Sequence, residues 1–307
     1  MRDLNALPLA ELFAELTADG SLSRVIDAAM EEDLGPPGAA GDVTSRAMIG
    51  SSQKGTGRIV ARHAGVLAGL AAMPTLIARF EGALTFAPAA EDGQSCQPGA
   101  ALGTIQGRMR AMLSLERTML NLLSHLSGIA TLTRRYVDAI QGTIAVICDT
   151  RKTAPGLRRL EKYAVRCGGG TMHRFGLFDA ALIKDNHLAG IDDAAMTQTL
   201  NEAAKKARAG KSVRFVEVEV DSLPQLQRIL ECESGRIDFV LLDNMAPAQL
   251  REAVAMRDAA KSVIRLEASG GVDIESVRAI AETGVDRISI GAITHSAPAL
   301  DIGLDIQ

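Results

Sequence analysis

The second half of the chain alternates short apolar runs with amphipathic stretches of helical length, and this rhythm constrains the fold more than any other feature. The runs span residues 144–148, 180–183, 213–220, 239–242, 263–266 and 287–290. Helical patterns separate most of them, as at 193–208, 247–260 and 274–282. Repeated strand–helix units predict a parallel sheet, and six in succession favour an α/β barrel over an open sheet.

Polar or glycine residues follow each of these runs directly. In chain order they are Arg151 with Lys152, Lys184, Glu219, Asp243, Ser269 with Gly270 and Gly271, and Gly291. The carboxyl ends of barrel strands meet at one mouth, which is where active sites of this architecture lie. Solvation explains a charge at one strand end, but a polar group at every consecutive strand end predicts a binding site.

Charges of opposite sign are separated along this mouth. The cationic residues come first, namely Arg151, Lys152, His173, Arg174 and Lys184, and Glu219 and Asp243 follow later in the chain. The whole chain has 33 Lys and Arg against 37 Asp and Glu, a net charge of −4, whereas residues 108–184 have 13 against 5. This distribution argues against a general nucleic-acid or anionic-membrane binder and favours a small polyanionic substrate.

Two carboxylates and two glycine turns suggest how a metal ion and the phosphates of such a substrate are bound. Glu219 and Asp243 are suited to Mg²⁺, which takes one or two protein carboxylates and completes its shell with water and phosphate oxygens. Glu217 points to the same side of its strand as Glu219, so the sequence leaves open which of them reaches the ligand. The turns at 269–271 and at Gly291 are typical phosphate sites. For His295, a phosphate contact and a structural role are equally expected.

The first part of the chain predicts a separate α+β unit. Helical patterns cover 9–16, 22–32 and 71–80, strands are expected near 57–65 and 101–107, and a Gly/Pro-rich loop covers 35–41. Apolar residues then recur at helical spacing over 109–140. Ser127-Gly128 is expected to break this stretch into two helices and to mark the domain boundary.

Cysteines and apolar stretches limit the cellular setting. The four cysteines form no CxxC pair, so we expect buried free thiols and neither a zinc site nor a disulfide framework. The apolar stretch 66–78 is too short to cross a bilayer, and the first residues, Met1, Arg2 and Asp3, lack the order of a signal peptide. We therefore expect a soluble, cytoplasmic protein.

Several long motifs, in order, resemble those of the quinolinate phosphoribosyltransferases, a family also called carboxylating nicotinate-nucleotide pyrophosphorylases. They lie at 116–121, 127–131, 149–156 (DTRKTAPG), 160–170 (LEKYAVRCGGG), 173–177 (HRFGL), 182–187 (LIKDNH), 216–219, 241–244, 267–271 and 289–291. The resemblance covers the chain from about Glu32 onward. It implies an N-terminal α/β sandwich over 1–127, on which the tail 296–307 packs, and an incomplete TIM-like α/β barrel over 128–295.

The resemblance also implies an activity, which is the transfer of phosphoribose from phosphoribosyl pyrophosphate (PRPP) to the ring nitrogen of quinolinate. Carbon dioxide and pyrophosphate leave, and the product is nicotinate mononucleotide for NAD synthesis. Mg²⁺ bound with PRPP, no organic cofactor and a homodimer are implied as well.

Site residues carry over by motif position. Quinolinate and phosphates would be bound by Arg117, Arg151, Lys152, His173, Arg174 and Lys184, with Arg117 donated by the neighbouring subunit. Glu219 and Asp243 would hold Mg²⁺-PRPP, the 5′-phosphate would lie at Ser269, Gly270, Gly271 and Gly291, and the implied catalytic residues are Lys152, Glu219 and Asp243.

Two departures from the family pattern are expected to be surface-loop variation. They are an insertion at 36–40 and an extra stretch at 232–236. Two alternative functions also stay open: a nicotinate-specific phosphoribosyltransferase, and a non-catalytic relative such as those associated with molybdenum transport. The 183–187 segment and both carboxylates favour the quinolinate enzyme over the non-catalytic relative.

Overall fold

The computed structural model describes residues 3–210 and 213–307, and its backbone contacts divide them into two compact units. The sandwich unit contains Leu4–Arg134, Thr153–Gly169 and Ala292–Gln307. The barrel unit contains Asp3, Arg135–Lys152 and Gly170–Gly291, apart from residues 211 and 212. The division into domains 1–127 and 128–295 stays a prediction. Met1 and Arg2, on which the expected lack of a signal peptide partly rests, lie outside the described residues.

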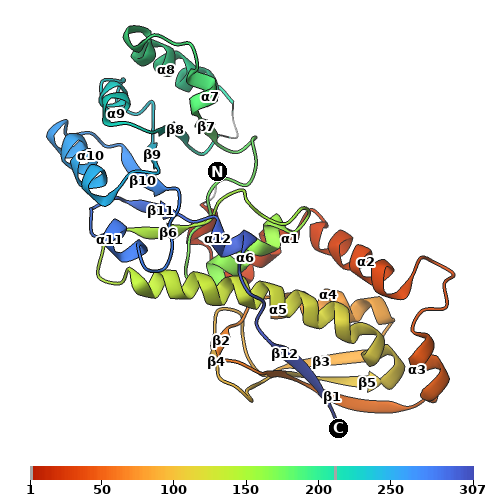
Figure 1. Ribbon diagram of the computed structural model, residues 1–307. Coiled ribbons are helices and arrows are strands. Elements are labelled where there is room, and N and C mark those ends of the chain that lie inside the picture. Colours follow the sequence, from red (N-terminus) through yellow and green to blue (C-terminus); the bar gives the residue numbers. More distant parts are fainter. Residues whose placement is uncertain (1–2, 211–212) are drawn as a thin grey trace. The chain divides into compact units, whose positions relative to one another are not determined.

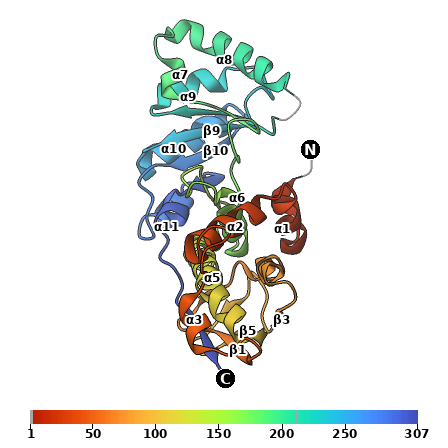
Figure 2. The same ribbon diagram turned by 90° about the vertical axis from the view of Figure 1, so that its right-hand side faces the viewer.

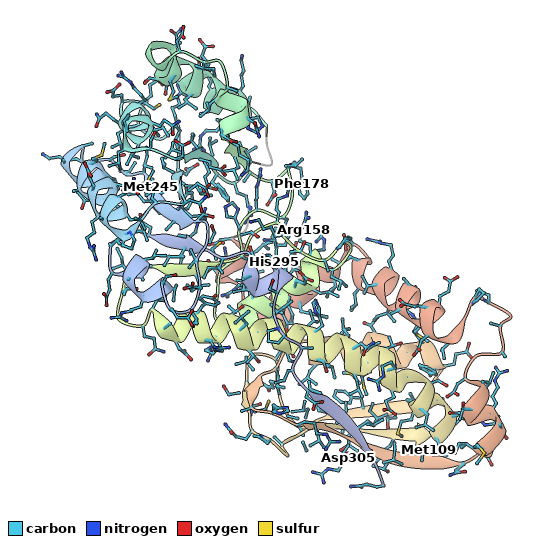
Figure 3. All side chains as sticks on the ribbon, in the orientation of Figure 1. Met109, Arg158, Phe178, Met245, His295 and Asp305 are labelled. Carbon is cyan, nitrogen blue, oxygen red and sulfur yellow. The ribbon has the colours of Figure 1, made fainter. Side chains whose placement is uncertain are left out.

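The sandwich unit is built on a four-stranded antiparallel sheet. Its strands, in spatial order, are β12 (Ile302–Ile306), β1 (Lys54–Ala61), β5 (Ala101–Arg108) and β3 (Leu84–Pro88). A separate pair joins β2 (Gly65–Val66) to β4 (Ser95–Cys96). The last strand of the chain therefore pairs with the first strand of this sheet, as Figure 1 shows. At this edge Arg62 forms an ion pair with Asp305, which Figure 3 labels.

The sandwich unit also contains short helices, three of which confirm the helical patterns expected at 9–16, 22–32 and 71–80. The helices are α1 (Leu9–Thr17), α2 (Ser21–Leu34), α3 (Val43–Met48), α4 (Met73–Ile77), α6 (Arg158–Cys167) and α12 (Ala292–His295). Single 3₁₀ turns cover η1 (Leu4–Ala6), η2 (Leu70–Ala72) and η3 (Ala78–Phe80). Among the described residues, no helix is both long and apolar enough to span a membrane.

One continuous helix, α5 (Met109–Ala139), replaces the two helices expected around Ser127-Gly128, so that expectation was wrong. The Ser127 hydroxyl exchanges hydrogen bonds with the N–H and C=O of Ala68, at 3.0 and 3.2 Å. A Cβ on Gly128 would lie 2.1 Å from the Pro298 carbonyl oxygen. The two residues therefore let other backbone segments approach the helix, and the helical hydrogen bonds continue through them.

Tight packing holds α5 against the antiparallel sheet. Gly55 and Gly57 of β1 leave room for Met109 and Met112, because a Cβ at either glycine would overlap the methionine side chain. Figure 3 labels Met109 at this point. Further along, Leu115, Met119 and other apolar positions of α5 are buried at helical spacing. The sequence pattern therefore identified the core face of this helix.

The barrel unit contains one sheet of six parallel strands. In spatial order they are β6 (Val146–Cys148), β11 (Arg287–Ser289), β10 (Arg265–Ser269), β9 (Phe239–Asp243), β8 (Val216–Val220) and β7 (Ala181–Ile183). Neighbours in this order are consecutive in the chain except at β6 and β11, which is the order of a barrel. No pairing joins β6 to β7 within the described residues, and Thr171 adds only an isolated bridge to Cys148. The two predicted folds, an incomplete barrel and an α/β sandwich, are confirmed.

Helices connect the later strands on the outside of this sheet (Figures 1 and 2). They are α7 (Asp185–Leu188), α8 (Asp193–Arg208), α9 (Leu223–Leu230), α10 (Pro247–Ala259) and α11 (Val277–Ala281), and α8 to α11 contact one another in succession. The stretches 36–40 and 232–236 lie outside helices and strands and are mostly exposed, as expected for loop variation.

Asp42 caps α3 in the sandwich unit. Its Oδ1 accepts the Ser45 N–H at 2.9 Å, and its Oδ2 accepts the Ser114 hydroxyl at 3.4 Å. Hydrogen bonds from Ser45 hold the pKa of this carboxyl below its ordinary value of 3.8. The cap is therefore strongest when Asp42 is ionised.

We expect Asp42→Ala to lower the free energy of unfolding by about 1 kcal/mol near neutral pH. Because the pKa is lower in the folded chain, the stabilisation is complete above the unfolded pKa and is lost as the pH falls through the folded value. Urea denaturation followed by circular dichroism over this range measures the difference. Asp42→Asn keeps a capping oxygen and should remove the pH dependence only. An Ala effect that is equal at every pH would contradict this origin.

Candidate active site

The carboxyl ends of the six parallel strands surround one cavity of about 620 Å³. Ten of the predicted site residues line it, namely Arg151, Lys152, His173, Arg174, Lys184, Glu219, Asp243, Ser269, Gly270 and Gly271. Thr150, Leu182, Leu241, Asn244, Glu267 and Ser289 complete the wall. Parallel pairing brings together residues that are up to 139 positions apart, from Thr150 to Ser289, because it places all strand ends at one edge.

Two predicted residues are not part of this wall. Gly291 follows β11 and precedes α12, two residues beyond Ser289, which does line the cavity. Arg117 lies on α5 in the sandwich unit, where it lines a different cavity of about 320 Å³ with residues of α2 and α5 such as Ile26, Asp33 and His125. Within one chain, the structure thus assigns Arg117 to a second pocket.

Lys184 and Glu219 form an ion pair at the rim, with Nζ 2.5 Å from Oε2. The Glu219 side chain is 15% exposed, and Leu241 lies beside it in the strand register. Asp243 comes two residues after Leu241 on the same face of β9, and it accepts a hydrogen bond from the Asn244 amide at 2.7 Å. The two carboxylates therefore stand on neighbouring strands at successive levels of the mouth.

Glu217 is fully buried, in contrast to Glu219 two residues later. It accepts a hydrogen bond from Arg287 Nη2 at 3.0 Å, and it does not border the cavity. Of the two glutamates between which the sequence could not decide, Glu219 therefore faces the cavity. The charge of the buried Glu217 is opposed by a cation from another strand, which bonds one of its two oxygens and which the local sequence pattern does not reveal.

A buried ionic cluster lies beneath the mouth and consists of His173, Glu217, Glu267 and Arg287. Arg287 Nε donates to Glu267, and His173 Nε2 lies 2.9 Å from Glu217 and 3.6 Å from Glu267. Burial raises the pKa of both carboxyls, and the positive charge of Arg287 opposes that rise. The sequence analysis overlooked Arg287, although an arginine that opens an otherwise apolar strand was a usable signal.

Three members of this cluster resemble a ligand set for a metal. Single ligand atoms of His173, Glu217 and Glu267 all lie within 4.8 Å of one another. The Arg287 guanidinium, however, already donates to both carboxylates and supplies a positive charge between them. A divalent cation would have to share these oxygens with a guanidinium, which is unfavourable.

Arg151, Arg174, Lys184 and Leu182 border a second, more apolar cavity of about 480 Å³ as well as the first. The remaining wall of the second cavity comes from β7, α7 and α8, with side chains such as Leu188 and Leu200. Burial first, and then the positive charge of Arg151, lower the pKa of the Arg174 guanidinium. The repulsion that this reflects would be relieved by an anionic ligand.

The turn after β10 depends on glycine. Gly270 and Gly271 have φ values of +93° and +59°, a region that favours glycine. A Cβ on Gly270 would lie 2.2 Å from Asn244 Oδ1, whereas a Cβ on Gly271 would meet nothing within 4 Å. The Asn244 N–H also donates to the Ser269 carbonyl at 2.8 Å. The turns after β9 and β10 are thus packed directly on each other.

His295 lies in α12 of the sandwich unit and is labelled in Figure 3. Its Nδ1 is 2.6 Å from the Ser296 hydroxyl, and the side chain is exposed. Two further histidines have carboxylate neighbours: His63 lies 3.8 Å from Asp301, and His125 lies 2.9 Å from the buried Glu161.

One unit is an incomplete barrel with cations and glycine turns at its mouth, and the other is an α/β sandwich with an antiparallel sheet. Together they define the phosphoribosyltransferase class with the type II fold. Residues 42–127 match the family described as quinolinate phosphoribosyl transferase, N-terminal domain, and residues 129–305 match its C-terminal domain. The chain belongs to the quinolinate phosphoribosyltransferase family.

Individual relatives agree with this assignment. The chain is 45% identical, over 86% of its length and 91% of the relative, to the carboxylating nicotinate-nucleotide pyrophosphorylase of Mycobacterium leprae. It is 37% identical to the decarboxylating quinolinate phosphoribosyltransferase 1b of Nicotiana tabacum, over 93% of this chain and 82% of that one. The nicotinate-nucleotide pyrophosphorylase structure from Francisella tularensis superposes with a TM-score of 0.85 at 34% identity and covers all of both chains.

We expect Gly270→Ala to lower the free energy of unfolding by about 2–4 kcal/mol, since it adds a steric overlap with Asn244 to the strain of a positive φ. Gly271→Ala is the matched control, because it has the strain without the overlap and should cost about 1–2 kcal/mol. Urea denaturation of both variants measures the difference. Equal losses would show that the contact between the two turns is unimportant.

Proposed function

We propose that this chain transfers phosphoribose from PRPP to the ring nitrogen of quinolinate and releases carbon dioxide and pyrophosphate, leaving nicotinate mononucleotide. The observation that carries the proposal is the cavity of about 620 Å³ that is lined both by cations following β6 and β7 and in the 173–174 segment, and by the carboxylates of β8 and β9. The names of the relatives, which include both carboxylating pyrophosphorylases and decarboxylating phosphoribosyltransferases, support the same reaction.

The acceptor half of the site, which binds quinolinate, is proposed at the wall shared by the cavities of about 620 and 480 Å³. Arg151, Arg174 and Lys184 border both cavities, so they can reach two carboxylates of one small ring. Arginine suits bidentate carboxylate binding, and lysine acts as a point charge. Aliphatic side chains of the second cavity offer an apolar surface for the ring itself. A dicarboxylate acceptor is therefore a better match to three clustered cations than a monocarboxylate.

The donor half of the site, which binds PRPP, is proposed at the carboxyl ends of strands β8 to β10. Ser269, Gly270 and Gly271 would bind the 5′-phosphate through backbone N–H groups, and Gly291 would extend this turn region. Glu219 and Asp243 fit Mg²⁺ because both offer hard oxygen ligands on one cavity wall. When bound with PRPP, Mg²⁺ would neutralise charge on the leaving pyrophosphate.

The residues of the chain suggest how both chemical steps are assisted. As pyrophosphate leaves, the ribosyl carbon gains positive charge, which Glu219 and Asp243 stabilise electrostatically from the cavity wall. Lys152, exposed at the mouth, is placed to attract the phosphates. Once the ring nitrogen is bonded to ribose it is cationic, and that charge stabilises the carbanion left when the adjacent carboxylate is lost as carbon dioxide. The carbanion then takes a proton from water to give nicotinate mononucleotide.

A homodimer is part of the proposal, because the family resemblance implies that Arg117, which lies in the sandwich unit, is donated by the neighbouring subunit. Its guanidinium would complete the acceptor half of the neighbour's site. This arrangement is closed and symmetric, since each subunit would donate one Arg117 and receive another. Cytoplasmic location remains an expectation from the sequence.

We expect purified protein to form nicotinate mononucleotide and an equal amount of carbon dioxide from quinolinate, PRPP and Mg²⁺. Nicotinate in place of quinolinate should give at least about 100-fold less product, since one cationic subsite would be left without its carboxylate. Liquid chromatography of the nucleotide measures both reactions. Preferred use of nicotinate would support the altered transferase, and no turnover of either acid would support a non-catalytic relative.

Donation of Arg117 between subunits predicts complementation. Arg117→Ala and Lys184→Ala should each be inactive alone, but dimers formed from both chains contain one site without either substitution. After unfolding and refolding together, an equal mixture should regain about a quarter of wild-type activity. Arg117→Ala mixed with itself is the control. Activity that does not reappear in verified mixed dimers would mean that Arg117 acts within its own chain.

A further inference from the structure

The middle layer of the barrel interior is ionic, where barrels ordinarily pack branched aliphatic side chains. Glu217 of β8, Glu267 of β10 and Arg287 of β11 all point inward, and their exposed fractions are 0%, 0% and 8%. Glu267 and Arg287 are direct neighbours in the strand register. Burying three ionisable side chains costs free energy that an aliphatic layer would not cost. We therefore expect these side chains to have a role beyond packing.

Arg287 is the group that connects this layer. Its Nε donates to Glu267, and its Nη2 donates to Glu217 Oε1 at 3.0 Å. Below the guanidinium lie the rings of Phe239, with its centroid 3.8 Å away, and Phe215 at 5.4 Å. Aromatic rings therefore hold the planar Arg287 guanidinium on one side, and two carboxylates from different strands hold its N–H groups.

The cluster holds His173 in one orientation. The backbone N–H of Arg174 donates to His173 Nδ1 at 2.7 Å, and because an N–H can only donate, the ring proton lies on Nε2. That nitrogen is 2.9 Å from Glu217 Oε2, an ionic proximity, and 3.4 Å from Arg287 Nη2. On the backbone side, the His173 N–H donates to Asp149 Oδ1 at 2.8 Å. Both ring nitrogens of His173 thus face groups of the protein.

The orientation of the His173 ring also affects the backbone of its neighbour Arg174, whose side chain borders both cavities. The hydrogen bond to His173 Nδ1 comes from the Arg174 backbone, and the Arg174 guanidinium donates to the Ala180 carbonyl at 3.2 Å. A rotation of the His173 ring would remove the acceptor from the Arg174 N–H. Any change in the ionic layer is in this way transmitted to a cation of the acceptor half.

We propose that Arg287 is a positioning residue for the acceptor: by joining Glu217 to Glu267 it holds His173, and through it Arg174, in the orientation that binds the acceptor's carboxylates. This inference rests on the proposed function for the identity of the acceptor. Arg287 itself does not border the cavity, so it acts through its neighbours.

The test compares Arg287→Met with Arg265→Met, a matched control. The Arg265 guanidinium also lies over Phe239, at 4.0 Å, but the side chain is exposed. We expect Arg287→Met to raise KM for quinolinate about 10- to 100-fold, with KM for PRPP changed less than about threefold. Arg265→Met should leave both constants at their wild-type values.

Two further variants keep the test valid if Arg287→Met fails to fold. The double variant Glu267→Gln/Arg287→Met removes one acidic and one basic group together. Arg287→Lys keeps the positive charge but loses the planar guanidinium that bonds two carboxylates at once. Both should melt near the wild-type temperature and still raise KM for quinolinate. The imidazole ¹⁵N spectrum, assigned with His173→Asn, should show one fixed tautomer in wild type and an average of two in these variants.

The outcomes separate this inference from the proposed function. Wild-type protein that makes no nucleotide from quinolinate contradicts the proposed function, whereas the ¹⁵N spectrum still tests whether Arg287 orients His173. A wild-type KM for quinolinate in the folded double variant would overturn the positioning role. An equal rise of KM for quinolinate and KM for PRPP in that variant would also overturn it. So would the finding that wild-type protein binds one equivalent of a divalent metal and that Glu217→Gln does not, since the cluster would then be a metal site.

Discussion

Parallel pairing of the strands is the constraint on which the rest of this structure depends. Each strand must hydrogen-bond to its neighbours in the same direction, so helices return the chain outside the sheet and all carboxyl ends meet at one edge. Residues from Thr150 to Ser289 therefore share a single cavity. No local interaction between them is needed for this convergence.

The place where the sheet stays open contributes to the site as well. Between β6 and β7 the chain makes only an isolated bridge, in which the Thr171 N–H donates to Ile147 and the Asp149 N–H donates to Thr171. His173 and Arg174 follow immediately and lie beside the cavity. A closed barrel would use this segment as a full strand, whereas here its irregular backbone delivers two cationic residues to the mouth.

The predicted elements and the observed ones differ where tertiary contacts outweigh the local pattern. The apolar run at 263–266 stops before Glu267, yet strand β10 continues to Ser269. The ion pair with Arg287 makes a buried Glu267 tolerable, and that partner is 20 residues away in the chain. Likewise, Ser127-Gly128 is typical of a helix break, but contacts with Ala68 and Pro298 keep the helix continuous.

The sequence pattern by itself determined the barrel, the core face of α5 and most of the residues at the mouth, whereas the sandwich was implied by the family resemblance. The pattern could do so because hydrophobic period and strand-end position are local properties of the chain. Only the tertiary structure decided that Glu219 faces the cavity while Glu217 is buried, and that Arg117 lines a separate pocket. Periodicity specifies the side of a strand or helix, but depth depends on which distant charges pack against that side.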